Sequence, residues 1–229
     1  GNKNAALPCL AATLLTDERV VLNNLPQIED VHIMVSLLEH LGSRVERLSP
    51  HAVAVTSAPA NRSHDELLPS RLVDAIRASI LLAGPLVARR SKVILPPPGG
   101  DVIGFRRLDT HFLGLQALGC TCRISADGLL ELEAKRLAGS TIFLDEASVT
   151  ATENVIMAAV LCPGETVIAN AACEPHVQDL CAMLVSMGAR ISGIGSNLLT
   201  IGGVASLGGC EFTIGADYME VGSFIGLAA

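Results

Sequence analysis

A short acidic loop followed by paired arginines is the segment of this 229-residue chain best suited to chemistry. Asp101 follows two glycines, Arg106 and Arg107 come five and six residues later, and Asp109 supplies a second carboxylate. Guanidinium groups bind phosphate or carboxylate through forked hydrogen bonds, and glycines let a loop move and approach a ligand closely. The segment predicts an anion-binding loop; the alternative is a turn and a helix start with solvated charges.

Two further positions carry side chains suited to anionic or sugar ligands. Lys3 is a point charge for phosphate, and Asn4 can donate to and accept from sugar hydroxyls. Arg77 stands in the middle of an apolar helical pattern, where a half-buried guanidinium needs an anionic partner. The alternatives are a frayed, solvated terminus for Lys3 and Asn4, and a structural pair with Asp74 or Glu66 for Arg77.

Composition excludes several classes of protein. Half of the residues are hydrophobic, aromatics make up only 3%, and the formal charge of -7 argues against a nucleic-acid binder, which needs a basic face. No apolar run reaches the roughly 18 residues that span a bilayer. The seven scattered cysteines have no histidine partner at metal-ligand spacing. We therefore expect a cytoplasmic protein with no metal, no other cofactor and no membrane partner.

Landmarks in the sequence recur three times. An amphipathic helix reaches Gly42, Gly119 or Gly188, and a strand begins at once. Each glycine is preceded by an Ala/Leu-rich helix that runs into a β-branched strand, and is followed by a second short strand. The second strands are expected at 51–56, 128–133 and 197–201. The repeated unit is therefore helix, strand, helix, strand, strand.

The repeats define an expected domain organisation. Units at about 1–58, 66–135 and 140–205 form one domain over 1–215, and 216–229 looks like the first helix of a second domain. The first helix of each unit is apolar nearly all round, which indicates burial on every side. We expect an α/β fold in which three buried helices lie inside, with strands and amphipathic helices outside.

Four segments carry a resemblance to a known family: Gly1 to Pro8, Arg77 to Ile80, Pro98 to Gly100 and Asp145 to Thr152. Together they resemble the enolpyruvyl transferase family, in order and over essentially the whole chain. The resemblance implies an inside-out α/β barrel with three units per domain and an active site in the cleft between two domains. This chain would then carry one domain and half of the site.

The resemblance also implies a function. Family members of this kind transfer enolpyruvyl from phosphoenolpyruvate to the 3′-hydroxyl of UDP-N-acetylglucosamine and release phosphate, the first committed step of bacterial peptidoglycan synthesis. Asp101 would be the catalytic acid that protonates C3 of the enolpyruvyl group. The expected substrate-binding residues are Lys3, Asn4, Arg77, Arg106, Arg107, Leu108, Asp109, Thr110, Glu146, Ser148 and Val149.

Three residues depart from the family pattern and keep alternatives open. Glu146 stands where the family typically has Lys, Arg107 replaces Pro, and Tyr218 replaces Arg. These departures favour a non-catalytic paralogue that binds nucleotide sugars. A second alternative is an enolpyruvyl transferase with another acceptor, but the shikimate-pathway relative typically carries Lys-Ser where this chain has Lys3 and Asn4.

Asp101 generates a first prediction. The family usually has Cys at this position, and the epoxide antibiotic fosfomycin alkylates that thiol. A carboxylate there should leave the protein unmodified, so intact mass after exposure to fosfomycin should show no adduct at residue 101. An adduct mapped to that residue would contradict the assignment of Asp101 to the proton-donating position.

Overall fold

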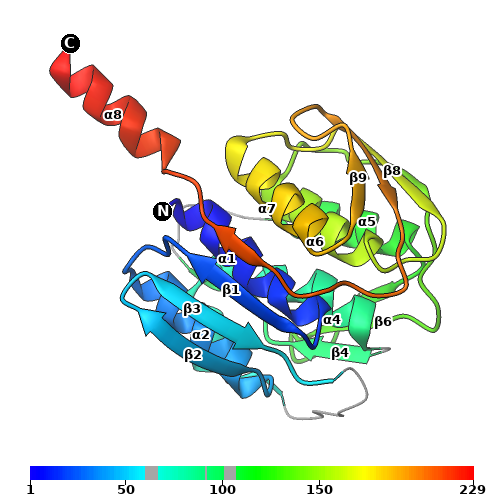
Figure 1. The fold of residues 1–229 in the computed structure, drawn as a ribbon. Coiled ribbons are helices and arrows are strands. Elements are labelled where there is room, and N and C mark those ends of the chain that lie inside the picture. The colour runs from blue at the N-terminus through cyan, green and yellow to red at the C-terminus, as the bar shows by residue number, and fades with distance from the viewer. Residues whose placement is uncertain (60–66, 91, 101–106) are drawn as a thin grey trace.

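The computed structural model describes residues 1–59, 67–90, 92–100 and 107–229 (Figure 1). The first unit comprises α1 (Lys3–Ala12), the short 3-10 helix η1 (Thr13–Leu15), β1 (Arg19–Asn23), α2 (Glu29–His40), β2 (Arg44–Ser49) and β3 (Ala52–Thr56). The second comprises α3 (Ser70–Ala75), the 3-10 helix η2 (Arg77–Leu82), α4 (Ala83–Arg89), β4 (Lys92–Leu95), α5 (Asp109–Ala117), β5 (Thr121–Ile124) and β6 (Leu130–Glu133). The third comprises α6 (Val149–Ala159), β8 (Glu165–Ala169), α7 (Pro175–Ser186), β9 (Arg190–Ser192) and β10 (Leu198–Gly202). Strand β7 (Thr141–Phe143) precedes the third unit, and β11 (Glu211–Thr213) and α8 (Tyr218–Ala228) follow it.

Each unit builds its own sheet. The three strands of a unit pair antiparallel, with the last strand in the centre, in the orders β1-β3-β2, β4-β6-β5 and β8-β10-β9. Two strands outside the units extend these sheets in parallel: β7 pairs with β8, and β11 pairs with β1. The segment 204–215, which follows the third unit, therefore returns to the sheet of the first unit.

The turn from helix to strand has the same geometry in all three units. Gly42, Gly119 and Gly188 have φ values of 89°, 99° and 102°, a conformation that only glycine adopts without strain. The residue after each glycine donates its N–H back to the helix, for example Ser43 N to Leu38 O at 2.9 Å. This is the hydrogen bond of a glycine C-cap, so the recurring glycines mark helix ends as predicted.

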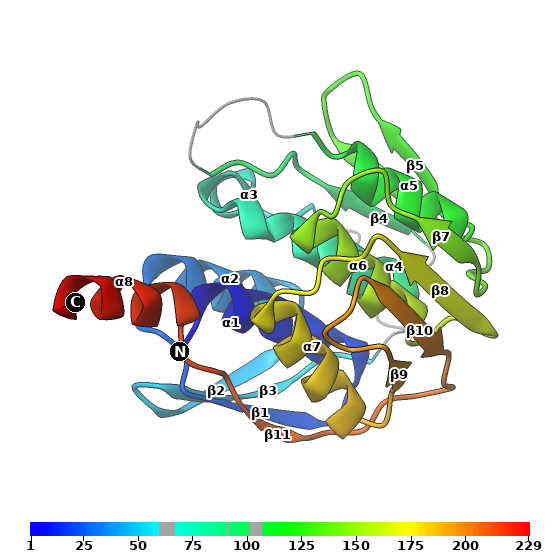
Figure 2. The ribbon, with the colours of Figure 1, turned by 90° about the horizontal axis from the view of Figure 1, so that it is seen from above.

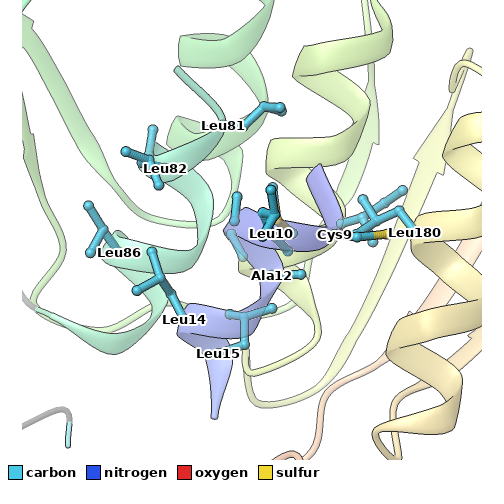
Figure 3. Packing of buried hydrophobic residues seen from close by; sticks show 14 of the residues in the cluster. Cys9, Leu10, Ala12, Leu14, Leu15, Leu81, Leu82, Leu86 and Leu180 are labelled. Atoms are coloured by element: carbon cyan, nitrogen blue, oxygen red, sulfur yellow. The ribbon is translucent and has the colours of Figure 1, made fainter. Parts of the chain in front are cut away.

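The internal helix of each unit is buried, as its apolar pattern predicts. In the second unit this is η2 together with α4, whereas the preceding α3 buries only Val73. Residues 5–12 of α1 and 151–159 of α6 are entirely buried. Helix α6 packs on η2 and α4, which in turn pack on α1 and η1, while α2, α5 and α7 cover this group from outside (Figure 2). Figure 3 shows Leu14 beside Leu86, and Cys9 beside Leu180 of α7. The expected α/β fold, with three repeated units around buried helices, is confirmed.

The local structure around Arg77 differs from the expectation. Helix α3 ends at Ala75, Ile76 is extended with φ -133° and ψ 136°, and Arg77 begins the 3-10 helix η2. The Ser79 hydroxyl stabilises this break because it donates to the Val73 and Ile76 carbonyls at 2.9 and 2.8 Å. Arg77 therefore stands at a helix start instead of mid-helix.

The C-terminal helix lies apart from the rest of the chain (Figure 1). None of the residues of α8 is buried, and Phe224, Ile225 and Leu227 expose 64% or more of their surface. An apolar helix of this kind normally packs against another element. Among the described residues, no helix is long and apolar enough to cross a membrane.

Close packing between α4 and α6 depends on one glycine. A Cβ added at Gly84 would lie 2.4 Å from the Asn154 carbonyl oxygen and 2.8 Å from its Oδ1. Backbone atoms at that distance cannot move independently of the helix that carries them. The missing side chain therefore sets the distance between the two helices.

Gly84→Ala should lower the free energy of unfolding by on the order of 2 kcal/mol, because overpacking outweighs the gain in helix propensity. Urea unfolding followed by circular dichroism measures the change. Gly222→Ala on α8 is the matched control, since nothing lies within 4 Å of its added Cβ, and it should not destabilise the protein. Equal unfolding midpoints for Gly84→Ala and the wild type would refute this packing argument.

Candidate functional site

A cavity of about 300 Å³ brings together residues that lie far apart in the sequence. Its lining consists of Lys3, Asn4, Leu7, Asp30, Ala75, Ile76, Arg77, Ala78, Gly100 and Thr150. Two side chains are cationic, one is acidic, and three of the residues were predicted to bind substrate. A larger cavity of about 450 Å³, between α2 and β4, is mainly aliphatic and contains none of the predicted site residues.

The cavity lies where the internal helices of all three units begin. Lys3 and Asn4 open α1, Arg77 and Ala78 open η2, and Thr150 is the second residue of α6. The first N–H groups of a helix have no partner within it and carry a partial positive charge. Three helix starts around one cavity therefore favour an anionic ligand before any side-chain charge is counted.

The N-terminus is held in place. The backbone N–H of Asn2 donates to the Gly215 carbonyl at 2.9 Å, and its side-chain oxygen caps α1 by accepting from Asn4 N at 2.7 Å. Lys3 Nζ lies 3.0 Å from Asp30 Oδ2. The terminus is therefore ordered and does not fray, which leaves Lys3 and Asn4 fixed at the cavity.

Arg77 connects two segments that the sequence separates. Its guanidinium donates to the Pro98 carbonyl and to the Arg107 carbonyl, each at 3.4 Å. Pro98 precedes the two glycines of the predicted anion-binding loop, and Arg107 follows that loop. Arg77 therefore holds both ends of the loop near the cavity.

Four of the predicted substrate-binding residues, 107–110, lie at the start of α5. Arg107 forms a salt bridge with Asp109, the first residue of that helix, and Leu108 stands immediately before it. The pair is more than half exposed, so it contributes little to stability. The Thr110 hydroxyl donates to Asp145 Oδ1 at 2.8 Å, which joins this segment to the turn ahead of α6.

The remaining predicted residues lie at the start of α6. Glu146 is exposed, Ser148 caps the helix by accepting from Ala151 N at 3.4 Å, and Val149 is its first residue. They are neighbours of Thr150 but do not line the cavity. Two predicted residues, Asp101 and Arg106, lie outside the described residues.

A buried hydrogen-bond network connects these helix starts. Asn154 of α6 accepts from Gly84 N at 2.6 Å and donates to the Ile80 carbonyl at 3.0 Å. Its amide nitrogen also lies 3.0 Å from His111 Nδ1, and His111 Nε2 lies 3.1 Å from the Thr150 hydroxyl. One amide therefore joins α6 to η2, α4 and α5.

His111 is neutral within this network. Its side chain is 3% exposed, and burial, with a smaller effect of the Arg77 charge, lowers its pKa from 6.5 to about 4. Protonation would place a hydrogen on Nδ1 opposite the Asn154 amide, which is itself a donor there. Both the surroundings and the partner of His111 therefore disfavour the charged form.

Sequence reasoning missed Thr150, His111 and Asn154. Thr150 follows directly after the predicted residues Ser148 and Val149, and this adjacency was the only signal available for it. His111 and Asn154 look like ordinary polar residues in helices, and their pairing links positions 43 residues apart. No spacing rule within one sequence identifies such a contact.

The arrangement is suited to binding an anion that also carries hydroxyl groups. Lys3, Arg77 and the helix starts favour phosphate or carboxylate, and Asn4 can bind hydroxyls. In the part of the chain that the structure describes, no group of three or more acidic, histidine or cysteine side chains could hold a metal ion. The side chains that line the cavity are suited to electrostatic binding of such a ligand.

The low pKa of His111 predicts a pH-dependent stability. Between pH 6.5 and about 4 the unfolded chain takes up a proton on His111 and the folded chain does not, so the free energy of unfolding falls as the pH falls. The loss across this window should be on the order of 3 kcal/mol.

His111→Asn, in which an amide oxygen replaces Nδ1, should flatten this dependence in urea unfolding measured between pH 7.5 and 4.5. His32→Asn on α2 is the control and should keep the wild-type slope. Identical slopes for His111→Asn and the wild type would contradict a neutral, buried His111.

Comparison with known proteins identifies relatives over the whole chain. The model of the family described as EPSP synthase (3-phosphoshikimate 1-carboxyvinyltransferase) matches residues 1–229. A protein of Treponema pallidum named UDP-N-acetylglucosamine 1-carboxyvinyltransferase is 58% identical over 228 residues, which is all of this chain and 52% of the relative. The protein of the same name from Treponema denticola is 57% identical, with 53% of its length covered.

A solved structure confirms the fold. The enolpyruvyl transferase NikO from Streptomyces tendae matches with a TM-score of 0.83 at 24% identity, over 98% of this chain and 52% of that one. The chain thus spans about half the length of the relatives that it matches. The family match over every residue, supported by the shared fold, places this chain in the EPSP synthase family of enolpyruvyl transferases.

Proposed function

We propose that this chain supplies half of the active site of a bacterial enzyme that transfers enolpyruvyl from phosphoenolpyruvate to the 3′-hydroxyl of UDP-N-acetylglucosamine. The observation that carries the proposal is 58% identity, over the full chain, to a relative named for that activity. The cavity supports it because Lys3, Asn4 and Arg77 line one space. The reaction is the first committed step of peptidoglycan synthesis and takes place in the cytoplasm.

The proposed binding roles follow the charges of the cavity. Lys3 and Arg77 bind phosphate oxygens, and Asn4 binds the sugar or phosphoenolpyruvate. Leu108, Asp109 and Thr110 contact the uracil and ribose at the start of α5. Ser148 and Val149 lie at the start of α6, where backbone N–H groups favour the diphosphate.

The proposed chemistry is general acid catalysis. The sugar 3′-hydroxyl attacks C2 of phosphoenolpyruvate while Asp101 delivers a proton to C3, and phosphate then leaves the tetrahedral intermediate. Asp101 must be protonated to do this, although a free Asp has a pKa of about 3.9. A bound phosphate dianion and the loss of water around the ligand would favour the protonated carboxyl that this step needs. Arg106 contacts both substrates in this proposal.

The partner of this half-site is a second domain of the same enzyme. The chain covers 52–53% of these two curated relatives, so the remaining half of such a protein is long enough to form the second domain. The exposed apolar side chains of α8 favour a neighbouring element at that end of the chain. The proposed reaction uses no cofactor.

Two of the three departures from the family pattern, Arg107 and Glu146, are compatible with activity. The Arg107 carbonyl accepts from the Arg77 guanidinium, so this segment stays attached at the cavity without the usual Pro. Glu146 is exposed and does not line the cavity, so its charge stays in contact with solvent. The non-catalytic paralogue remains the alternative that the experiment must separate.

Phosphate release from phosphoenolpyruvate plus UDP-N-acetylglucosamine tests the proposal. The 229-residue chain alone should release none, because half of the site is absent, and a polypeptide extended to the length of the relatives should release phosphate. Omission of UDP-N-acetylglucosamine is the control and should abolish release. An inactive extended form that still binds the sugar nucleotide would favour the paralogue, and Glu146→Lys would then be the next variant.

A further inference from the structure

We infer that Thr150 is a ligand-binding residue, whose hydroxyl donates a hydrogen bond into the cavity to a phosphate oxygen of the ligand. A fixed relay from Asn154 through His111 orients that hydroxyl. The identity of the ligand rests on the proposed function, whereas the direction of the hydrogen bond rests on contacts within this chain.

The relay begins at the amide of Asn154, whose orientation is fixed by two backbone groups of opposite character. Its oxygen accepts from Gly84 N at 2.6 Å, and its nitrogen donates to the Ile80 carbonyl at 3.0 Å. A flipped amide would place donor against donor and acceptor against acceptor. The second hydrogen of that nitrogen therefore points at His111 Nδ1, 3.0 Å away.

This contact determines the tautomer of His111. Because Nδ1 accepts from Asn154, the single proton of the neutral ring lies on Nε2. His111 is buried, and its low pKa keeps the ring neutral at physiological pH. Nε2 therefore donates to the Thr150 hydroxyl oxygen, 3.1 Å away.

The Thr150 hydroxyl oxygen accepts from His111, so its own proton remains free to be donated in another direction. It cannot donate to His111, because Nε2 already carries a hydrogen. Within the part of the chain that the structure describes, His111 is the partner recorded for this hydroxyl. Thr150 is half-buried and lines the cavity, so the cavity is where its proton finds an acceptor.

The surroundings specify an anionic acceptor. Lys3 and Arg77 share the cavity, and the starts of α1 and α6 add partial positive charge. Phosphate oxygens could come from the diphosphate of UDP-N-acetylglucosamine or from phosphoenolpyruvate. The two sources share the same chemistry and are separated by titrating each ligand alone.

Isothermal titration calorimetry on the 229-residue chain tests the inference. Thr150→Val keeps the shape and removes the hydroxyl, so it should weaken binding of the relevant ligand about tenfold, the scale of a hydrogen bond to a charged group. Thr150→Ser should bind within about twofold of the wild type. A loss with only one of the two ligands identifies the phosphate that Thr150 contacts.

Thr152→Val is the matched control on the same helix. The Thr152 hydroxyl accepts from Ala172 N at 3.0 Å and does not line the cavity. This variant should lower the unfolding midpoint and leave ligand affinity unchanged.

Unchanged affinity of Thr150→Val for both ligands would overturn the inference. Binding of neither ligand to the wild type would count against the proposed function, and pyrophosphate titrated into the same variants would then decide the role of Thr150.

The relay itself predicts coupling between two substitutions. His111→Asn removes the N–H that orients Thr150, so it should weaken binding in the wild-type background and add little in the Thr150→Val background. A structural effect alone would lower stability by the same amount in both backgrounds and would add fully to the loss of affinity. Additive losses of affinity would overturn the relay.

Discussion

The amide of Asn154 is the interaction on which the geometry of the site depends. All three of its hydrogen-bonding contacts are buried, and they join α6 to η2, α4 and α5. A buried polar group without partners would cost more than these bonds contribute, so the network has one low-energy arrangement. Gly84 makes that arrangement possible because any side chain at this position would occupy the space of the Asn154 oxygens.

This constraint links the repeated architecture to the cavity. Each unit contributes one internal helix, and the packing of those helices places their first turns around one space. Strand β11 fixes the start of the chain, since it pairs with β1 while the adjoining Gly215 accepts from Asn2. The position of Lys3 is therefore set by residues more than 200 positions away.

The sequence predicted the repeated elements and the buried helices because their signals are local. Glycine at helix ends, β-branched runs and all-round apolar helices each depend on a few neighbouring residues. The missed features depend on contacts between separate parts of the chain. Strands β7 and β11 have only three residues each and form by pairing with β8 and β1. The break before Arg77 depends on the Ser79 hydroxyl.

Glu153 and Asn154 show the same limit, because both are buried polar residues in one apolar helix. Asn154 is fully paired, whereas burial raises the pKa of Glu153 well above its usual value, with a smaller effect from Glu174.

The cavity has cationic character although the protein is acidic, because Lys3, Arg77 and the starts of α1 and α6 all lie at it. The chain has a formal charge of -7, and Lys3 is paired with Asp30, so the net side-chain charge near the cavity is small. The Lys3–Asp30 pair is partly exposed, at 47% and 34%, and such a pair is worth at most about 1 kcal/mol. A phosphate that entered the cavity would therefore replace Asp30 as the partner of Lys3 at little cost in free energy. Helix starts, by contrast, keep their direction without a ligand, so in the function proposed above they would favour an anion without rearrangement.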